Sequence, residues 1–159
     1  MSISPPDKLR CEYLENPIGI DIQNPRFFWT LHHKERNQYQ TAYQILVSSD
    51  QANLIYEKGD VWDSDKVASD QTTHIAYAGK MLESGTRYFW RVRWWDKNNH
   101  PSPYSEIAFF EMGFFNDSDW QAKWISKQDV KEFKVKGVLV TESPNVESDA
   151  LLLKKTYFL

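Results

Sequence analysis

The chain has 159 residues and a net charge of −3, and it is 41% hydrophobic and 26% charged. This length allows one domain plus a remainder, and a domain of this size can bury a core without disulfide bonds. The slightly negative charge excludes the basic surface that nucleic-acid-binding and anionic-membrane-binding proteins need. Aromatic residues are unusually frequent at 15%, with seven tryptophans among them. The sequence therefore raises the question of where these rings lie.

The start of the chain resembles no targeting segment. Residues 1–21 lack the basic and then apolar stretch of a secretion signal, and no run approaches the ~20 apolar residues of a transmembrane helix. The sequence predicts a cytoplasmic protein with no membrane partner, although a secreted chain that had lost its leader would look the same. The single cysteine, Cys11, is expected to be a small core residue rather than a reactive thiol.

Short runs with the alternation of β-strands recur from the N-terminus onward. In chain order, the expected strands lie within residues 8–14, 26–32, 39–49, 61–67, 73–79, 87–96 and 104–112. The only helix candidate is a single turn that Ser49 or Asp50 caps and Gly59 ends. About seven short strands separated by turns predict an all-β sandwich with antiparallel sheets.

Two of these runs predict which residues face the core, because alternate residues of a strand point to opposite faces. In the run 39–49, the set expected to share one face is Tyr39, Thr41, Tyr43, Ile45 and Val47, and the polar set on the other face is Gln40, Gln44 and Ser48. In the run 87–96, the apolar set is Tyr88, Trp90, Val92 and Trp94, and the mixed set is Phe89, Arg91, Arg93 and Trp95. We expect the apolar set of the second run to fill the interior. The mixed set should form a covered but hydrated surface, where arginine planes stack on aromatic rings.

The segment before residue 87 has the spacing L-x-x-G-T-x-Y, formed by Leu82, Gly85, Thr86 and Tyr88. It resembles the tyrosine corner of β-sandwich domains, in which a tyrosine hydroxyl bonds to upstream backbone. The pattern is similar to that of fibronectin type III domains, and Trp29 fits the tryptophan of their second strand. The resemblance implies an immunoglobulin or fibronectin type III-like sandwich.

The sandwich is expected to occupy residues 1–118. Residues 119–148 are charged and weakly patterned and are interpreted as a linker, with Trp120 and Trp124 as anchors on a neighbouring surface. Residues 149–159 are strongly strand-like and are interpreted as the truncated first strand of a following β-sandwich. The alternative is a terminal strand added to the first sandwich.

Several phrases in order resemble the N-terminal region of the bacterial α-L-rhamnosidases. They are LRCEYLENPIGID (9–21), PRFFW (25–29), QYQTAYQILVSS (38–49), GDVWDSDKV (59–67), GTRYFWRVRWWD (85–96) and DWQAKWIS (119–126). Two positions depart from the family pattern. Asp65 stands where the family usually has glycine, so the turn there is expected to differ, and residues 98–100 replace a glycine-containing turn.

The resemblance implies a parent enzyme that hydrolyses terminal α-L-rhamnosyl groups with inversion. Such chemistry uses two carboxyl groups, roughly 6.5–9.5 Å apart, which in the family belong to an (α/α) barrel far downstream. No position of this chain matches them, so the resemblance implies no catalytic residue and no cofactor here. The expected role is structural: the chain packs on downstream domains of the parent enzyme.

The alternative function is an independent carbohydrate-binding or adhesion module, with a rhamnose-containing carbohydrate as a possible ligand. Its platform would be Trp95 with Arg93 and Asp96, or Trp62 with Asp63. Against this, both tryptophans are also suited to packing on neighbouring strands.

Metal sites are not expected. Asp60, Asp63 and Ser64 have oxygens that suit Ca²⁺, but capping of their own turn is the favoured interpretation. His32 and His33 point to opposite faces if they lie on a strand, and the sequence lacks the ligand spacing of a zinc site.

Overall fold

The computed structural model describes residues 3–120, 133–135 and 138–140. The chain divides into two units, Met1–Trp120 and Gln121–Leu159. In the second unit, β9 (Phe133–Val135) pairs antiparallel with β10 (Val138–Val140). No strand pattern in the sequence predicted this pair within the linker. Trp124 and residues 149–159 lie outside the described residues. The linker and terminal-strand assignments stay predictions.

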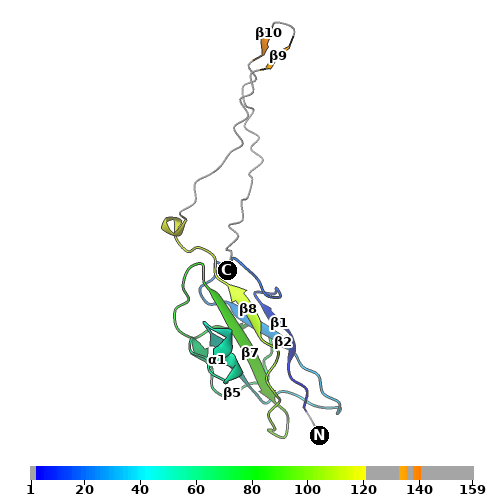
Figure 1. The fold of residues 1–159 in the computed structure, drawn as a ribbon. Coiled ribbons are helices and arrows are strands. Elements are labelled where there is room, and N and C mark those ends of the chain that lie inside the picture. Colours follow the sequence, from blue (N-terminus) through cyan, green and yellow to red (C-terminus); the bar gives the residue numbers. More distant parts are fainter. Residues whose placement is uncertain (1–2, 121–132, 136–137, 141–159) are drawn as a thin grey trace. The chain divides into compact units, whose positions relative to one another are not determined.

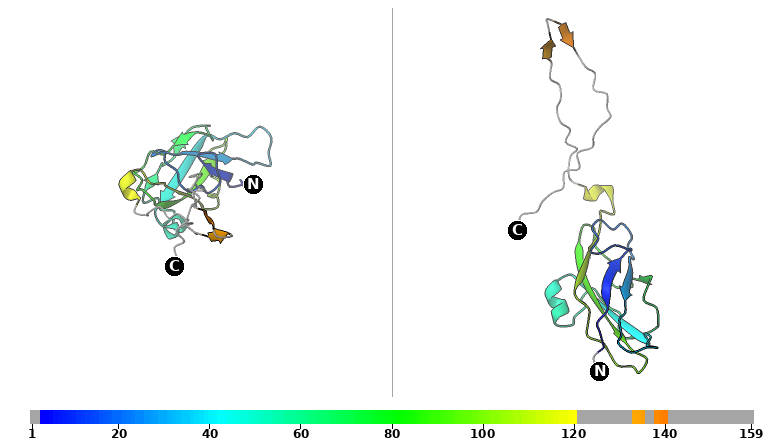
Figure 2. Two further views of the ribbon diagram at one scale, coloured as in Figure 1. Left: turned by 90° about the horizontal axis from the view of Figure 1, so that it is seen from above. Right: turned by 90° about the vertical axis from the view of Figure 1, so that its right-hand side faces the viewer.

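The first unit is a sandwich of two antiparallel sheets (Figures 1 and 2). The first sheet has the order β1 (Asp7–Cys11), β2 (Arg26–Thr30) and β6 (Ile75–Ala76). The second has the order β4 (Trp62–Asp63), β3 (Ala42–Ser48), β7 (Arg87–Trp95) and β8 (Ala108–Glu111), and β5 (Val67–Ala68) also pairs with β3. Because β4 and β5 share one edge of β3, these eight strands fill seven positions. The predicted antiparallel β-sandwich is confirmed.

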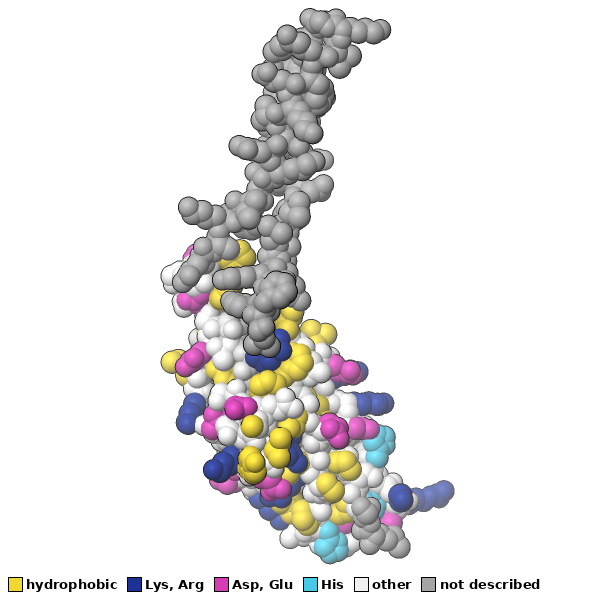
Figure 3. All heavy atoms as spheres, viewed as in Figure 1, with side chains coloured by type: hydrophobic (Ala, Val, Ile, Leu, Met, Phe, Trp, Pro, Cys, Tyr) yellow, Lys and Arg dark blue, Asp and Glu magenta, His cyan; other side chains and the backbone are white. Residues whose placement is uncertain are grey.

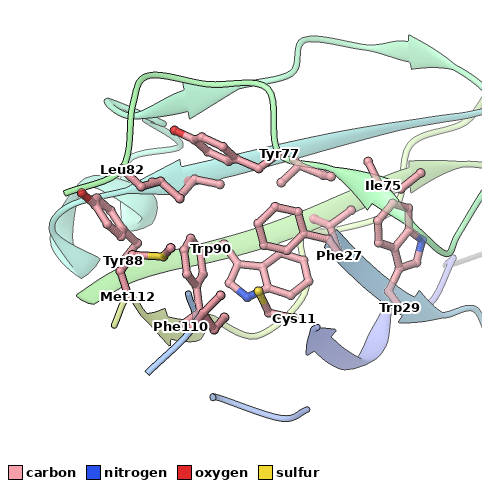
Figure 4. Packing of buried hydrophobic residues seen from close by; sticks show 14 of the residues in the cluster. Cys11, Phe27, Trp29, Ile75, Tyr77, Leu82, Tyr88, Trp90, Phe110 and Met112 are labelled. Atoms are coloured by element: carbon pink, nitrogen blue, oxygen red, sulfur yellow. The ribbon is translucent and has the colours of Figure 1, made fainter. Parts of the chain in front are cut away.

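Aromatic rings from both sheets form the interior (Figure 4). Phe27 on β2 is fully buried, and its ring lies 4.5 Å from that of Trp90 on β7 and 5.7 Å from that of Phe110 on β8. Cys11 is 1% exposed in the same cluster, and burial raises the pKa of its thiol. The predicted role of Cys11 as a core residue is confirmed.

The apolar set predicted for β7 is buried, as expected. Its four members are at most 4% exposed: Tyr88, Trp90, Val92 and Trp94. The first three belong to the core between the sheets. Trp94 donates its indole N–H to the carbonyl of Ser4 at 3.0 Å, so the segment before β1 is fixed to this strand.

The prediction for β3 is only partly right, because this strand is buried on both faces. Tyr43, Ile45 and Val47 enter the core as predicted, but Tyr39 precedes the strand and is 56% exposed. Leu46 points the other way, into a second cluster. The strand lies between β4/β5 and β7, and its outer face is covered.

The polar residues expected on the outer face of β3 are also buried, and each has hydrogen-bond partners. Gln40 accepts from the Trp29 indole at 3.2 Å and donates to two backbone carbonyls. Gln44 bonds to Arg93 and Asp63, and Ser48 bonds to Asp50. These bonds compensate for the loss of water around the buried polar groups.

The cover of the outer face is helix α1 (Gln51–Ile55), which lies on the side of β7 away from β1 and β2 (Figures 1 and 2). Asp50 caps it by accepting from the Ala52 N–H at 2.9 Å, as predicted. The helix ends at Ile55 rather than near Gly59. Glu57, two residues later, has a left-handed backbone with φ +57°, which a right-handed helix cannot continue through. Leu54 packs with Leu46 and with Tyr104 in a second, smaller core.

The segment before β8 runs beside β7 without forming a regular strand. Here Ser102 and Ser105 bond to β7 through both backbone and side chain: their N–H groups donate to Trp94 and Val92 carbonyls, and their hydroxyls accept from the Trp94 and Val92 N–H groups. The serine hydroxyls therefore complete the hydrogen bonding that a regular strand would provide.

The predicted tyrosine corner is present. The Tyr88 hydroxyl accepts a hydrogen bond of 2.8 Å from the backbone N–H of Glu83. We expect Tyr88→Phe to lower the free energy of unfolding by about 1 kcal/mol, because the bond is lost while the ring stays buried. Denaturant melts would measure this. The control is Tyr39→Phe at a 56% exposed ring, and equal effects of the two changes would contradict the assignment.

Each of the two departures from the family pattern contains a residue with a left-handed backbone. Asp65 has φ +52° and Asn99 has φ +63°, and both therefore adopt the left-handed conformation that glycine adopts most easily. Asp and Asn tolerate it better than other non-glycine residues. Asp65 and Asn99 therefore adopt a backbone conformation that glycine would also accept, and the expected difference in the turn at Asp65 stays a prediction.

None of the helices in the described part of the chain has the length and apolar character that would let it cross a membrane.

Candidate functional site

Trp95 and Arg93, two residues proposed for carbohydrate binding, lie in a stack of cations and rings on the outer face of the second sheet. The guanidinium of Arg93 lies 5.1 Å from the Trp95 ring centroid and 4.6 Å from that of Tyr104, and the Arg91 guanidinium lies 4.2 Å from that of Tyr104. Lys66 adds its ammonium group 4.8 Å from the Trp95 centroid. The predicted stacking of arginines on aromatic rings is confirmed.

The polar groups of this stack already bond to one another, so few are left to bind a ligand. Arg93 donates twice to the side-chain oxygen of Gln44, at 2.7 and 3.0 Å, and Gln44 donates to Asp63 at 2.7 Å. Trp95 is only 7% exposed. A sugar that stacked on Trp95 would have to displace Lys66 or Arg93 from its ring.

Asp96, the third of these residues, organises the turn after β7. It is 3% exposed, and one carboxylate oxygen accepts from the N–H groups of His100 and Asn98, at 2.8 and 2.9 Å. Burial opposes the charge on Asp96, but these two backbone donors together with the His100 ring outweigh it and hold the pKa of the carboxyl below its ordinary value. The carboxylate is occupied in shaping its own loop.

Trp62, the fourth residue, does not join the others. It pairs beside Val47, whereas Trp95 pairs beside Ala42 at the opposite end of β3. The Trp62 ring packs on the rings of Phe27 and Tyr77, at 6.1 and 5.3 Å. The structure therefore brings together Trp95, Arg93 and Asp96 but not Trp62. Carbohydrate binding by these four residues stays a prediction, and their contacts do not favour it.

The predicted capping of the acidic bend around β4 is only partly right, because Asp63 caps its own turn but Asp60 bonds to the segment before α1. Asp60 accepts from the hydroxyls of Ser48 and Ser49 and from the Ser49 N–H, and Asp63 accepts from the Asp65 N–H at 2.8 Å. Within the described residues, no group of three or more His, Cys, Asp or Glu side chains is placed to hold a metal ion.

A different surface concentrates exposed apolar side chains. It is the end of the sandwich where β8 stops, here called the exit end, formed by residues 14–20 of the loop after β1 and by residues 113–120. Its exposed apolar residues are Leu14 at 61%, Ile18 at 56%, Phe114 at 54% and Trp120 at 51%. Elsewhere on the face seen in Figure 3, hydrophobic and charged side chains are intermingled.

Backbone pairing holds the two parts of the exit end together. Ile20 forms a parallel bridge with Met112, and the Glu111 N–H donates to the Pro17 carbonyl at 2.9 Å. The Gly113 N–H donates to the Ile20 carbonyl at 2.6 Å. The loop after β1 is thus fixed beside the end of β8.

The last described turn, η1 (Asp117–Asp119), is tied back to the sandwich through one serine. The Ser84 hydroxyl donates to Asp119 at 2.7 Å and accepts from the Phe115 N–H at 3.1 Å. The Ser84 bond, with backbone donors, holds the pKa of the Asp119 carboxyl below its ordinary value. The Phe114 and Trp120 rings meet edge to face at 5.9 Å. The sequence pointed to Trp120 but not to Phe114 or Ser84, which carry no recognisable local pattern.

The sequence matches a family model described as the Rha78A-like N-terminal immunoglobulin domain over residues 6–116. An α-L-rhamnosidase of Formosa agariphila is 41% identical over 121 residues, which are 76% of this chain and 13% of that enzyme. An α-L-rhamnosidase of Streptomyces avermitilis is 38% identical over 139 residues, which are 87% of this chain and 12% of that enzyme. The chain thus spans about one-eighth of the length of the curated relatives that it matches.

Solved structures agree with these matches. The α-L-rhamnosidase of Dictyoglumus thermophilum is 47% identical with a TM-score of 0.75, over 80% of this chain and 14% of that one. The Streptomyces avermitilis α-L-rhamnosidase, solved with L-rhamnose, is 40% identical with a TM-score of 0.71, over 77% of this chain and 12% of that one. With the sandwich, the tyrosine corner and these matches together, the chain belongs to the Rha78A-like N-terminal immunoglobulin domain family found in α-L-rhamnosidases.

Proposed function

We propose that this chain is the non-catalytic N-terminal β-sandwich of a larger α-L-rhamnosidase and that it supports the downstream domains by packing against them. The observation that carries the proposal is the extent of the match. The relatives are α-L-rhamnosidases, and the chain corresponds to only 12–14% of their length, in the N-terminal domain. Hydrolysis of terminal α-L-rhamnosyl groups would then belong to the rest of the parent.

The acidic residues with depressed pKa values support a structural role, because each is engaged by its own fold. Glu12 is held by the hydrogen bonds of Arg26, Asp60 by serines, Asp96 by backbone donors and Asp119 by Ser84. Inverting hydrolysis instead needs one carboxyl group that keeps a proton and a second that activates water. None of these four is placed in an environment that keeps it protonated.

The direct test is an assay of the purified 159-residue chain with an aryl α-L-rhamnoside. We expect no release of the aryl group above the buffer rate. Turnover that scales with the concentration of the chain, and that persists after further purification, would overturn the proposal.

The exit end is the surface on which we expect the next domain to pack, because the chain leaves the sandwich there and exposed apolar rings flank that point. Exposed rings and aliphatic side chains of this kind are frequent anchors at interfaces between domains. Ile18 and Phe114 are both more than half exposed, so substituting either one tests this interface without touching the core.

We expect Ile18→Ser and Phe114→Ser to change the free energy of unfolding of this chain by less than about 0.5 kcal/mol, because both side chains are exposed. In the full-length parent polypeptide, each should cost about 1–3 kcal/mol, because an apolar contact is lost. Thermal and denaturant melts of both lengths would measure this. The control is Tyr56→Ser, at a 78% exposed residue beside α1. Equal effects at both lengths would contradict docking at the exit end.

A further inference from the structure

The outer face of the first sheet carries a groove that the scaffold role leaves unexplained. Its volume is about 280 Å³, and it is lined by Lys8, Arg10, Tyr13, Phe28, Thr30 and Thr73, among others. We call it the β1–β2 groove. Ligand pockets usually measure about 300–1,000 Å³. The groove lies just below this range, so it can hold no more than a small ligand such as one sugar residue.

The exposed ring in the groove is held rigidly. Tyr13 is 52% exposed, and its ring centroid lies 4.6 Å from that of Phe28. Its hydroxyl is 2.8 Å from Nε2 of His74, and the Arg26 guanidinium lies 5.2 Å from its ring centroid. Arg26 is itself fixed by two bonds to Glu12, at 2.7 and 3.1 Å. A ligand that stacks on Tyr13 would not have to order this ring, so the entropy cost of binding is low.

The backbone around the groove is bent in an uncommon way. The register between β1 and β2 shifts between Asp7 and Arg10, and Lys8, Tyr13 and His74 have φ values of +48°, +69° and +56°. Bulges redirect side chains, and left-handed non-glycine residues concentrate where function requires a fixed geometry. Here the bend places two cationic side chains and one ring along the same groove.

The two cations are available to a ligand. Lys8 is exposed and makes no hydrogen bond or ion pair within the described part of the chain, and Arg10 makes only a 3.7 Å contact with Glu15. The nearest carboxylate on the strand, Asp7, is engaged by His32 at 3.0 Å. The groove thus offers one unpaired cation, Lys8, and one loosely paired cation, Arg10, on a chain whose net charge is −3.

We infer that the β1–β2 groove binds an acidic saccharide. The C–H face of a uronic acid residue would stack on Tyr13, its carboxylate would meet Lys8 and Arg10, and its hydroxyls would bond to the hydroxyls of Thr30 and Thr73. An aromatic face beside cations suits a sugar that is apolar on one side and negatively charged at its edge, because charge-assisted hydrogen bonds to a carboxylate are stronger than neutral ones. This inference goes beyond the scaffold role and does not depend on it.

The test is a calorimetric titration of the full 159-residue chain with tetragalacturonate and, separately, with its methyl ester. The ester keeps the sugar rings and removes the charge. We expect tetragalacturonate to bind about threefold to fivefold more tightly than the ester, and this preference should vanish at high salt. Equal affinities, or no binding of either probe at millimolar concentration, would overturn the inference.

Substitutions of Tyr13 and Lys8 test whether the binding takes place in the groove. Tyr13→Ala should weaken binding of both probes by about tenfold, whereas Tyr13→Phe should retain it, because the ring and not the hydroxyl contacts the sugar. Lys8→Asn should remove the preference for the acidic probe, and asparagine tolerates the left-handed backbone at this position. A thermal melt of each variant checks that the sandwich still folds.

The matched control is Tyr39→Ala, which removes a tyrosine of similar exposure, 56%, outside the groove. It should leave both affinities unchanged. If Tyr39→Ala weakens binding as much as Tyr13→Ala does, or if Lys8→Asn keeps the preference for the acid, the groove is not the site.

Discussion

Replacing Trp90 with alanine is expected to lower the free energy of unfolding by about 3–5 kcal/mol, the range for truncating a buried large aromatic side chain. Trp90 is 1% exposed in the centre of the core, 4.5 Å from the ring of Phe27 on the opposite sheet. The substitution would therefore remove contacts that join the two sheets and leave a cavity between them. Urea denaturation, monitored by far-UV circular dichroism, would measure the loss.

The comparison for this change is Arg93→Ala on the other face of the same strand. Arg93 bonds to Gln44 and stacks on Tyr104 and Trp95, but its side chain is 28% exposed. Water can replace part of what the guanidinium loses, so we expect a cost of about 1 kcal/mol. A larger cost for Arg93→Ala than for Trp90→Ala would mean that the assignment of the two faces of β7 is wrong.

Removing the carboxylate of Asp96 is expected to be the second most costly change. Asp96→Ala leaves the N–H groups of Asn98 and His100 without their acceptor in a turn next to the core. Asn98 and His100 are exposed, so water can replace part of each bond. A hydrogen bond to a charged group contributes about 1.5–3 kcal/mol, and for the two together we expect a loss of about 2–4 kcal/mol in denaturant melts. Asp96→Asn is the matched control, because its amide oxygen can still accept from both donors. It should recover at least half of the loss; if it recovers nothing, the turn does not depend on these two bonds.

Asp96 should also contribute to the pH dependence of stability. Its carboxyl has a folded-state pKa below the ordinary value, and an unfolded aspartate titrates near pH ~3.9. The stabilisation is therefore fully present above the unfolded pKa and is lost as the pH falls through the folded pKa. Melts from neutral to acidic pH should show a smaller acid-induced loss for Asp96→Asn than for the unaltered chain, and parallel curves would contradict this.

The alternating pattern of β7 predicted both of its faces, because nine consecutive residues form one regular strand. The same reasoning failed for Tyr39, which lies outside β3, and for the exposure of Gln44, which is buried and bonded to Arg93 and Asp63. Local alternation predicts on which face of a strand each side chain lies. Whether the outer face is buried depends on contacts from distant parts of the chain. The tyrosine corner was predictable because it is a local spacing that ends at Tyr88.

The candidate sites show the same limit. Trp95 was a reasonable sugar platform from its neighbours in the sequence, but Lys66, from another strand region, lies over its ring. The β1–β2 groove was not predictable, because the bulge and the left-handed Lys8 and Tyr13 occur without the glycines that usually signal such a backbone. Strained non-glycine positions become visible only in the folded structure.

The irregular segment beside β7 has a consequence for solubility. A free sheet edge invites strand addition by a second copy, which leads to aggregation. Pro101 and Pro103 have no N–H to offer an incoming strand, and Ser102 and Ser105 turn both backbone and hydroxyl groups inward to β7. This border of the second sheet therefore protects the isolated domain from growing into ordered aggregates, even though its core is rich in rings.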